Sequence, residues 1–344
     1  MIHQHKSPHL LFGNRMVGPG HPVLIIAEIG INHEGRIDDC LEMIDQAAAA
    51  GADAVKLQFV KADESYVPGT ESHTIFKNAE LSDTEIERAF IHATETGVVL
   101  FCTCGDFVSL ETVNRFSPVA YKISSGLLTH LPLIDRVACT GKAIFISTGM
   151  ADQGRIRQAV KTATAAGCVH IGLFQCTSLY PAPWDKLNLS VISYLENKFG
   201  VPAGFSDHSL GVRASSFAVA AGARMIEKHF SLNPSRKGFD HAVSASPDEF
   251  VRMVNEIRQV EEMMGSIDGK AKSVNADKRN RLYRYIVARR DIAKDAIFEE
   301  DDIGVMRVKE SEHGLSPSYF ATVIGKTARR DIRRYKPLVE KDYR

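Results

Sequence analysis

In the segment RMIEKHF, residues 224–230, the apolar residues Met225 and Ile226 are followed by the charged and polar side chains of Glu227, Lys228 and His229. It is the last of eight short apolar runs, and helical patterns such as DCLEMIDQAAAAG (39–51) and TEIERAFIHATETG (84–97) separate these runs. The seven earlier runs are VLIIAE (23–28), DAVKLQ (53–58), VVLFCT (98–103), AYKISS (120–125), AIFIST (143–148), IGLFQCT (171–177) and PAGFSDH (202–208). Apolar strands that alternate with helices favour a parallel sheet covered by helices. Eight such units in about 240 residues predict an α/β fold, the (β/α)8 or TIM barrel.

A doubly wound open sheet is the structural alternative. No GxGxxG pattern follows the first strand, which argues against a dinucleotide-binding fold. The polar and basic stretch SIDGKAKSVNADKRNRL, residues 266–282, reads as a linker, and short β-prone runs with turns follow it. We therefore expect an N-terminal extension (1–20), a barrel (21–265), the linker (266–282) and a small β-rich domain (283–344).

The composition narrows the classes of partner. The 344 residues are 44% hydrophobic, as in a globular protein with a sizeable core, and no apolar run reaches membrane-spanning length. The start MIHQHKSPHL lacks the basic-then-apolar pattern of a secretory signal. The 42 basic and 42 acidic residues are intermixed. We expect a cytoplasmic protein that binds neither membrane nor nucleic acid.

A TIM barrel places its chemistry at the C-terminal ends of its strands. Seven of the eight predicted strands end in groups able to bind a ligand or catalyse a reaction. These side chains are Glu28, Lys56, Gln58, Lys122, Ser125, Ser147, Tyr180, Ser206, His208, Glu227 and His229.

The two histidines allow two interpretations. His208 and His229 end neighbouring strands, so their rings could converge on a divalent ion, with positions left open for water or substrate. Mn²⁺, Mg²⁺, Fe²⁺ or Zn²⁺ could act as a Lewis acid in such a site. The alternative is a pair of hydrogen-bonded core histidines with no shared role.

The strand-end lysines indicate an anion site. Lys56 and Lys122 lie in apolar sequence, and two buried like charges need an anion between them, for which phosphate is suited. The alternatives are pairing of each lysine with Glu28 or Asp53, and a Schiff-base lysine. The loop NPSRKGFDHAVS (233–244), which contains Asp240, reads either as a cover across the barrel mouth or as an ordinary solvated loop.

Ordered motifs over residues 20–340 resemble the sialic acid synthase family. They are IIAEIGINHEG (25–35), GADAVKLQ (51–58), YKISSG (121–126), ISTGM (146–150), CTSLYPAP (176–183), GFSDHS (204–209) and IEKHF (226–230). The tail, with IVARRDIAKDAIFEEDDIGVMRV and GLSPSYFATVIGKTARRDI, looks like that family's C-terminal antifreeze-like (SAF) domain. The resemblance implies condensation of phosphoenolpyruvate with an N-acylated amino sugar, which gives a nonulosonic acid and phosphate.

The resemblance also implies roles for matching residues. His208 and His229 match ligands of a divalent metal, Mn²⁺ or Mg²⁺. Glu28 matches a group that handles a proton or orients water. The phosphoenolpyruvate-binding positions are Lys56, Lys122, Ser125, Ser147 and Ser206, and those facing the sugar are Gln58, Tyr180 and Asp240. We place Glu227 with the substrate-binding residues. Arg307 matches an arginine that reaches the partner subunit's site in a domain-swapped homodimer.

The acceptor sugar and two other functions stay open. Ser178 stands where N-acetylneuraminate synthases usually have Asn, and Cys104-Gly105-Asp106 replaces the usual Pro-Phe-Asp. The acceptor is accordingly either N-acetylmannosamine or a di-acetamido hexose. The first alternative function is a barrel aldolase that uses Lys122 as a Schiff base. The second is a non-enzymatic, glycan-binding protein.

Overall fold

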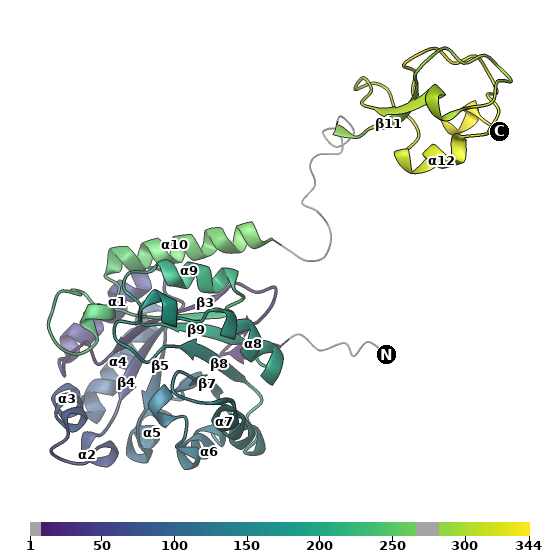
Figure 1. The fold of residues 1–344 in the computed structure, drawn as a ribbon. Coiled ribbons are helices and arrows are strands. Elements are labelled where there is room, and N and C mark those ends of the chain that lie inside the picture. The colour runs from purple at the N-terminus through teal and green to yellow at the C-terminus, as the bar shows by residue number, and fades with distance from the viewer. Residues whose placement is uncertain (1–7, 266–281) are drawn as a thin grey trace. The chain divides into compact units, whose positions relative to one another are not determined.

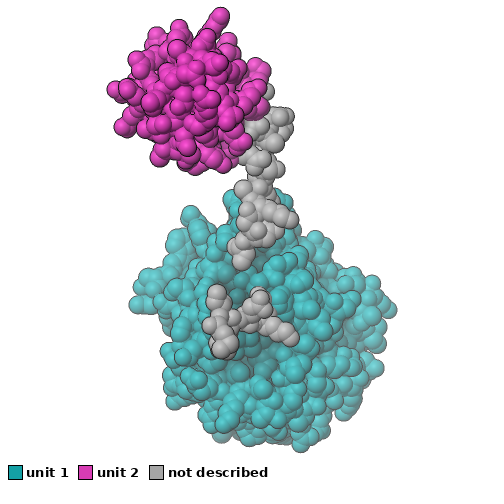
Figure 2. All heavy atoms as spheres, turned by 90° about the vertical axis from the view of Figure 1, so that its right-hand side faces the viewer, with its two compact units in different colours: residues 1–265 teal, residues 266–344 magenta. Residues whose placement is uncertain are grey.

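The computed structural model describes residues 8–265 and 282–344. They belong to two compact units, Met1–Gly265 and Ser266–Arg344 (Figure 2). Each unit has its own hydrophobic core. The predicted linker, 266–282, lies outside the described residues except for Leu282.

Eight parallel strands of the first unit close into a barrel, in the order β10-β3-β4-β5-β6-β7-β8-β9 (Figure 1). They are β3 (Leu24–Gly30), β4 (Ala54–Phe59), β5 (Val99–Cys104), β6 (Ala120–Ile123), β7 (Ala143–Ser147), β8 (Ile171–Cys176), β9 (Ala203–Asp207) and β10 (Met225–His229). Each of the eight apolar runs overlaps one of these strands, so the predicted TIM barrel is confirmed.

Helices cover the outside of the barrel. They are α1 (Ile37–Ala49), α2 (Ala62–Ser65), α3 (Glu71–Ala79), α4 (Asp83–Thr96), α5 (Phe107–Asn114), α6 (Leu131–Ala138), α7 (Gln153–Ala165), α8 (Ser190–Phe199), α9 (Arg213–Ala220) and α10 (Pro247–Met264). Local sequence sets their ends: α4 begins with a capping box of Ser82 and Glu85 and ends at Gly97, whose φ is 81°. None of the described helices combines the length and apolar character needed to cross a bilayer.

The alternation of side chains along a strand separates two apolar layers. In β3, Ile25, Ala27 and Ile29 join the core shared with the helices. Leu24 and Ile26 instead join a second cluster inside the barrel. Both faces of each strand are therefore buried, which explains why the strands read as continuous apolar runs.

A short N-terminal hairpin packs into this inner cluster. Its strands, β1 (Leu10–Phe12) and β2 (Arg15–Val17), pair antiparallel around Gly13, whose φ is 61°. Phe12 is buried against Phe101 and Phe145, with ring centroids 5.6 Å apart in both pairs. The hairpin thus covers the end of the barrel where the strands begin.

The second unit is small and β-rich. Strands β11 (Tyr285–Ala288) and β12 (Ile303–Met306) pair antiparallel, and α12 (Phe320–Val323) is a single turn. The sequence ARRDI occurs twice, at 288–292 and 328–332. The two copies meet through reciprocal hydrogen bonds of 2.8 Å between the backbones of Ile292 and Ile332. The unit is therefore built from two related halves.

Candidate active site

Four buried ionisable side chains meet inside the barrel at the C-terminal ends of the strands. The Lys56 Nζ atom of β4 lies 2.7 Å from Glu28 Oε2 of β3 and 3.8 Å from Glu227 Oε2 of β10. Lys122 of β6 donates to both carboxylate oxygens of Glu227, at 2.6 and 2.7 Å. Ser206 Oγ donates to Glu227 Oε1 at 2.9 Å. We call Glu28, Lys56, Lys122 and Glu227 the ion-pair cluster.

The two carboxylates of the ion-pair cluster differ in acidity. Burial raises the pKa of Glu28 above its usual value, although Lys56 opposes the shift. Burial acts on Glu227 too, but Lys122 and Lys56 outweigh it and lower the pKa of Glu227 to about 2. Two carboxyl groups with clearly different pKa values can take different roles in acid–base catalysis. Glu227 remains ionised, while Glu28 is the group able to carry a proton.

Two further side chains hold this cluster in place. Gln58 Nε2 donates to Glu28 Oε1 at 2.9 Å, and Lys56 Nζ donates to Thr103 Oγ1 at 3.2 Å. Gln58 was predicted at this site, and Thr103 was missed. Thr103 ends the run VVLFCT, so the rule that selected the other strand-end residues would have selected it as well.

The structure contains part of the alternative in which each lysine pairs with Glu28 or Asp53. Lys56 pairs with Glu28, as that alternative stated. Asp53, its other suggested carboxylate, instead pairs with Arg15 and with Arg258, whose Nη2 lies 3.2 Å from Asp53 Oδ2. The Asp53 part of that alternative is therefore wrong. The positive charges predicted to need an external anion are balanced within the cluster.

His208 and His229 converge beside the cluster, with ring centroids 5.5 Å apart. Tyr180 stacks on His208 at 4.3 Å and meets the edge of His229 at 5.8 Å. The Nδ1 atom of His208 lies 2.7 Å from the carbonyl oxygen of Thr177 and must donate to it. The Nε2 atom of His208 is consequently an acceptor, and it accepts from the Tyr180 hydroxyl at 3.0 Å.

Both histidines are held neutral, the form that binds metals. Burial lowers the pKa of His208 and brings that of His229 well below its usual value. His229 Nδ1 is buried without a hydrogen-bond partner, and Asp240 Oδ2 lies 3.7 Å from it. In the part of the chain that the structure describes, no group of three or more His, Cys, Asp or Glu side chains is arranged to hold an ion. The pair thus fits an open site in which water or substrate completes the coordination.

The remaining predicted residues lie at different places. Ser147 ends β7 and is buried. Ser125 follows β6, and its Oγ lies 3.2 Å from Cys176 Sγ and accepts from Gly149 N at 3.2 Å. Arg307 follows β12 in the second unit and is exposed. The structure therefore gathers the barrel residues at one end, and a role for Arg307 in a partner's site stays a prediction.

Two family models match the chain, the NeuB family over residues 43–269 and the SAF domain over residues 283–344. This chain belongs to the NeuB family. The resemblance to sialic acid synthases with a C-terminal SAF domain is thereby confirmed.

Three named proteins similar to this NeuB chain each cover 80% or more of it. The spore coat polysaccharide biosynthesis protein SpsE of Bacillus subtilis is 36% identical over 93% of this chain and 93% of its own length. An N,N'-diacetyllegionaminic acid synthase of Campylobacter jejuni is 33% identical over 90% of this chain and 97% of its own. The crystal structure of an N-acetylneuraminic acid (sialic acid) synthetase from Leptospira borgpetersenii has a TM-score of 0.75 and 31% identity, and covers 80% of this chain and 96% of its own.

Proposed function

We propose that this NeuB-family chain condenses phosphoenolpyruvate with an N-acyl amino sugar and forms a nonulosonic acid and inorganic phosphate. One observation carries the proposal: the ion-pair cluster lies beside two neutral histidines at the ends of the barrel strands. An anion-binding group and a Lewis-acid site are the two parts that this reaction needs. The relatives named as legionaminic and sialic acid synthases support the same reaction class.

The lysines would bind the phosphoenolpyruvate anion. Lys56 and Lys122 are buried and supply charge-assisted hydrogen bonds. The hydroxyls of Ser125, Ser147 and Ser206 would add neutral donors around the phosphate and carboxylate groups. In the free protein Glu227 keeps Lys122 in place, so the substrate must compete with an internal carboxylate for this lysine.

The histidine pair would hold a divalent ion, Mn²⁺ or Mg²⁺. The neutral rings, the acceptor atom Nε2 of His208, which the Tyr180 hydroxyl would have to release, and the unpartnered Nδ1 of His229 fit such an ion. A bound ion would act as a Lewis acid on the carbonyl group of the acceptor. The Thr177 carbonyl fixes the orientation of the His208 ring, as groups behind metal ligands commonly do.

The bond changes balance without any further reactant. C3 of phosphoenolpyruvate forms a bond to the aldehyde carbon of the open-chain sugar while the π electrons of the C=O bond move to the aldehyde oxygen, and C2 becomes electron-poor. Of the two protons of the water that then adds, one ends on the new hydroxyl group and the other on phosphate. Water adds at C2, and the C2–O bond to phosphate then breaks and releases inorganic phosphate. Glu28 would take the proton of that water, because its raised pKa and its contact with Lys56 suit a proton carrier.

The acceptor would lie against Gln58, Tyr180 and Asp240 at the barrel mouth. Burial and the charge of Glu28 raise the pKa of Asp240 to about 6, so this carboxyl can accept or donate a hydrogen bond near neutral pH. The acceptor class is N-acetylmannosamine or a di-acetamido hexose. Arg307 would reach it from the partner in a domain-swapped homodimer and offer planar donors to an acyl carbonyl.

The test is phosphate release from phosphoenolpyruvate with N-acetylmannosamine or a di-acetamido hexose. We expect release that EDTA stops and Mn²⁺ or Mg²⁺ restores, and loss of turnover in folded His208→Ala and His229→Ala variants. Full activity after rigorous chelation would contradict the metal assignment. Borohydride treatment with pyruvate tests the aldolase alternative, since only a Schiff-base enzyme would be trapped. Absence of phosphate release with every acceptor would overturn the proposal.

A further inference from the structure

A cavity of about 390 Å³ opens beside the ion-pair cluster, at the ends of β4, β5 and β6. Gln58 and Thr103 line its inner side. The same two residues hydrogen-bond Glu28 and Lys56. We call this space the side cavity. It shares a wall with the proposed reaction site and is large enough for part of a sugar-sized ligand.

Aromatic rings form the outer walls of the side cavity. Tyr66 and Phe76 stack with their centroids 4.9 Å apart, and both line the space. Phe107 and His130 face it as an edge-to-face pair at 5.7 Å. Such rings provide rigid apolar contact area with a polar atom at some edges. They suit the C–H face of a sugar or the methyl of an acyl group.

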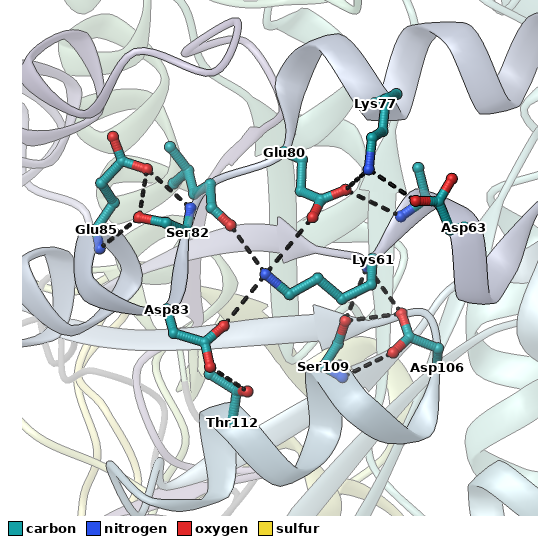
Figure 3. A network of polar contacts seen from close by, with 12 residues as sticks. Lys61, Asp63, Lys77, Glu80, Ser82, Asp83, Glu85, Asp106, Ser109 and Thr112 are labelled. Carbon is teal, nitrogen blue, oxygen red and sulfur yellow. Dashed lines mark hydrogen bonds and ion pairs between the residues drawn. The ribbon is translucent and has the colours of Figure 1, made fainter.

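A polar network that includes Lys61, Asp106 and Ser109 (Figure 3) links two of the helices next to this aromatic wall. The Asp106 carboxylate accepts from Ser109 N and Ser109 Oγ, both at 2.7 Å, and from Lys61 N at 2.9 Å. It also accepts from Ser65 Oγ at 3.1 Å. These bonds tie α2 to the start of α5. The cavity is therefore shaped in advance, which lowers the entropic cost of filling it.

The electrostatics of the side cavity disfavour an anion. Glu64 and Asp106 line it, and none of the described residues known to line it is Lys or Arg. The nearby Lys61 directs its ammonium group away, to the Leu81 carbonyl at 3.2 Å and to Asp83 at 3.2 Å (Figure 3).

We propose that the side cavity receives an uncharged substituent of the amino-sugar acceptor, an acylamino or methyl group, and rejects an acceptor that carries phosphate. This inference rests on the proposed function and deepens it, since it selects the chemical class of the acceptor. The acidic lining repels phosphate, and the aromatic rings make favourable contacts with apolar groups.

The test compares kcat/KM for N-acetylmannosamine, its 6-phosphate and a di-acetamido, deoxygenated hexose. The wild type should use the uncharged acceptors at least tenfold better than the phosphate. Phe76→Ala should raise the KM for the di-acetamido acceptor about twofold to tenfold, the range expected for lost aromatic contact, and leave the KM for phosphoenolpyruvate unchanged. Phe90→Ala is the matched control, because Phe90 stacks on Phe116 at 5.0 Å outside the cavity lining.

A second variant tests the charge argument at an exposed position. Glu64 is exposed, so Glu64→Lys should fold normally. It should reduce the ratio of kcat/KM for uncharged acceptors to kcat/KM for the phosphorylated acceptor at least threefold. Preference of the wild type for the phosphorylated acceptor, or an unchanged acceptor KM in Phe76→Ala, would overturn this inference and leave the proposed function standing. No turnover with any acceptor would overturn the proposed function and the inference together.

Discussion

Glu227 occupies the lysine donors that a substrate anion would use. Its two oxygens accept from Lys122, and one also accepts from Ser206. A buried ion pair of this kind costs desolvation and adds little net stability. In the proposed reaction its value would be to keep Lys122 charged and in place inside an apolar barrel until a more highly charged ligand binds.

This arrangement predicts the effect of removing each lysine. Lys56→Met and Lys122→Met should each raise the KM for phosphoenolpyruvate by about 10- to 150-fold, since a charge-assisted hydrogen bond contributes roughly 1.5–3 kcal/mol. Steady-state kinetics at saturating acceptor measures this change. Lys161→Met, at an exposed position on α7, should have no effect. An unchanged KM in both cluster variants would mean that the lysines serve only the fold.

Sequence order could place these residues at the strand ends but could not pair them all. Glu28 and Lys56 are register partners on the neighbouring strands β3 and β4, so their contact follows from chain order. Lys122 on β6 and Glu227 on β10 belong to strands that are not neighbours in the barrel. Their contact spans the barrel interior and depends on strand tilt and side-chain rotamers, which no local pattern reports.

At the scale of elements, the N-terminal hairpin was not predicted. Its strands have three residues each, too short for periodicity to indicate a strand. Its burial arises from tertiary contact with the barrel interior, where Leu10, Phe12 and Val17 join the inner cluster. The eight barrel strands were predicted because each is buried on both faces and therefore reads as an apolar run.

The hairpin should matter for stability and not for substrate binding. Phe12→Ala removes a ring buried between Phe101 and Phe145 and should lower the free energy of unfolding by about 3–5 kcal/mol. Leu11→Ala, at an exposed neighbouring position, should change it by less than about 0.5 kcal/mol. Denaturant unfolding measures both. A large change in the KM for phosphoenolpyruvate or for the acceptor, measured at a temperature where Phe12→Ala is folded, would show that the hairpin also affects substrate binding and would contradict this prediction.

The small unit depends on a buried carboxylate in its first half. Asp302 accepts from Glu299 N at 3.0 Å and pairs with Arg290, and Asp342 and Arg330 repeat this arrangement in the second half. Burial opposes the charge of Asp302, but the bonds from Arg290 and Glu299 lower its pKa below the usual value. A lowered carboxyl pKa gives stability that is present above the unfolded-state pKa, near 4, and lost as the pH falls through the folded-state pKa.

Asp302→Asn should therefore weaken this unit in a pH-dependent way. At pH 7 we expect about 1–2 kcal/mol less protection from hydrogen exchange in β11 and β12, since a charge-assisted bond is lost. The difference from the wild type should shrink below about pH 4, where Asp302 itself becomes protonated. Asp301→Asn, at an exposed neighbouring position, is the control. A difference that stays constant from pH 7 to pH 3 would rule out the ionised carboxylate as its cause.

At the scale of the whole molecule, the chain combines a NeuB barrel with a SAF domain. The barrel contributes every described residue of the ion-pair cluster and both histidines. Arg307 lies in the other unit. The polar stretch at 266–282 indicated this division in the sequence. Periodicity and composition of a single chain do not report contacts between subunits, so they cannot test the proposed role of Arg307.

The proposed domain swap predicts complementation between inactive variants. Arg307→Ala and His208→Ala should each be inactive, and a mixture that exchanges subunits should recover up to about a quarter of the wild-type activity. Half of the dimers would be mixed, and each would contain one site with both an intact barrel and an intact arginine. Full activity of Arg307→Ala would show that this residue has no role in the site. No recovery despite proven exchange would place Arg307 in its own subunit's site.

One isotope measurement tests the central claim most directly. Phosphoenolpyruvate with oxygen-18 in the C2–O–P bridge is incubated with the protein, a divalent ion and the best uncharged acceptor, and the phosphate and the nonulosonic acid are analysed by mass spectrometry. We predict one labelled phosphate for each product molecule, because the C2–O bond breaks after water adds at C2. Unlabelled phosphate, with the label retained in the organic product, would contradict this account of the barrel site.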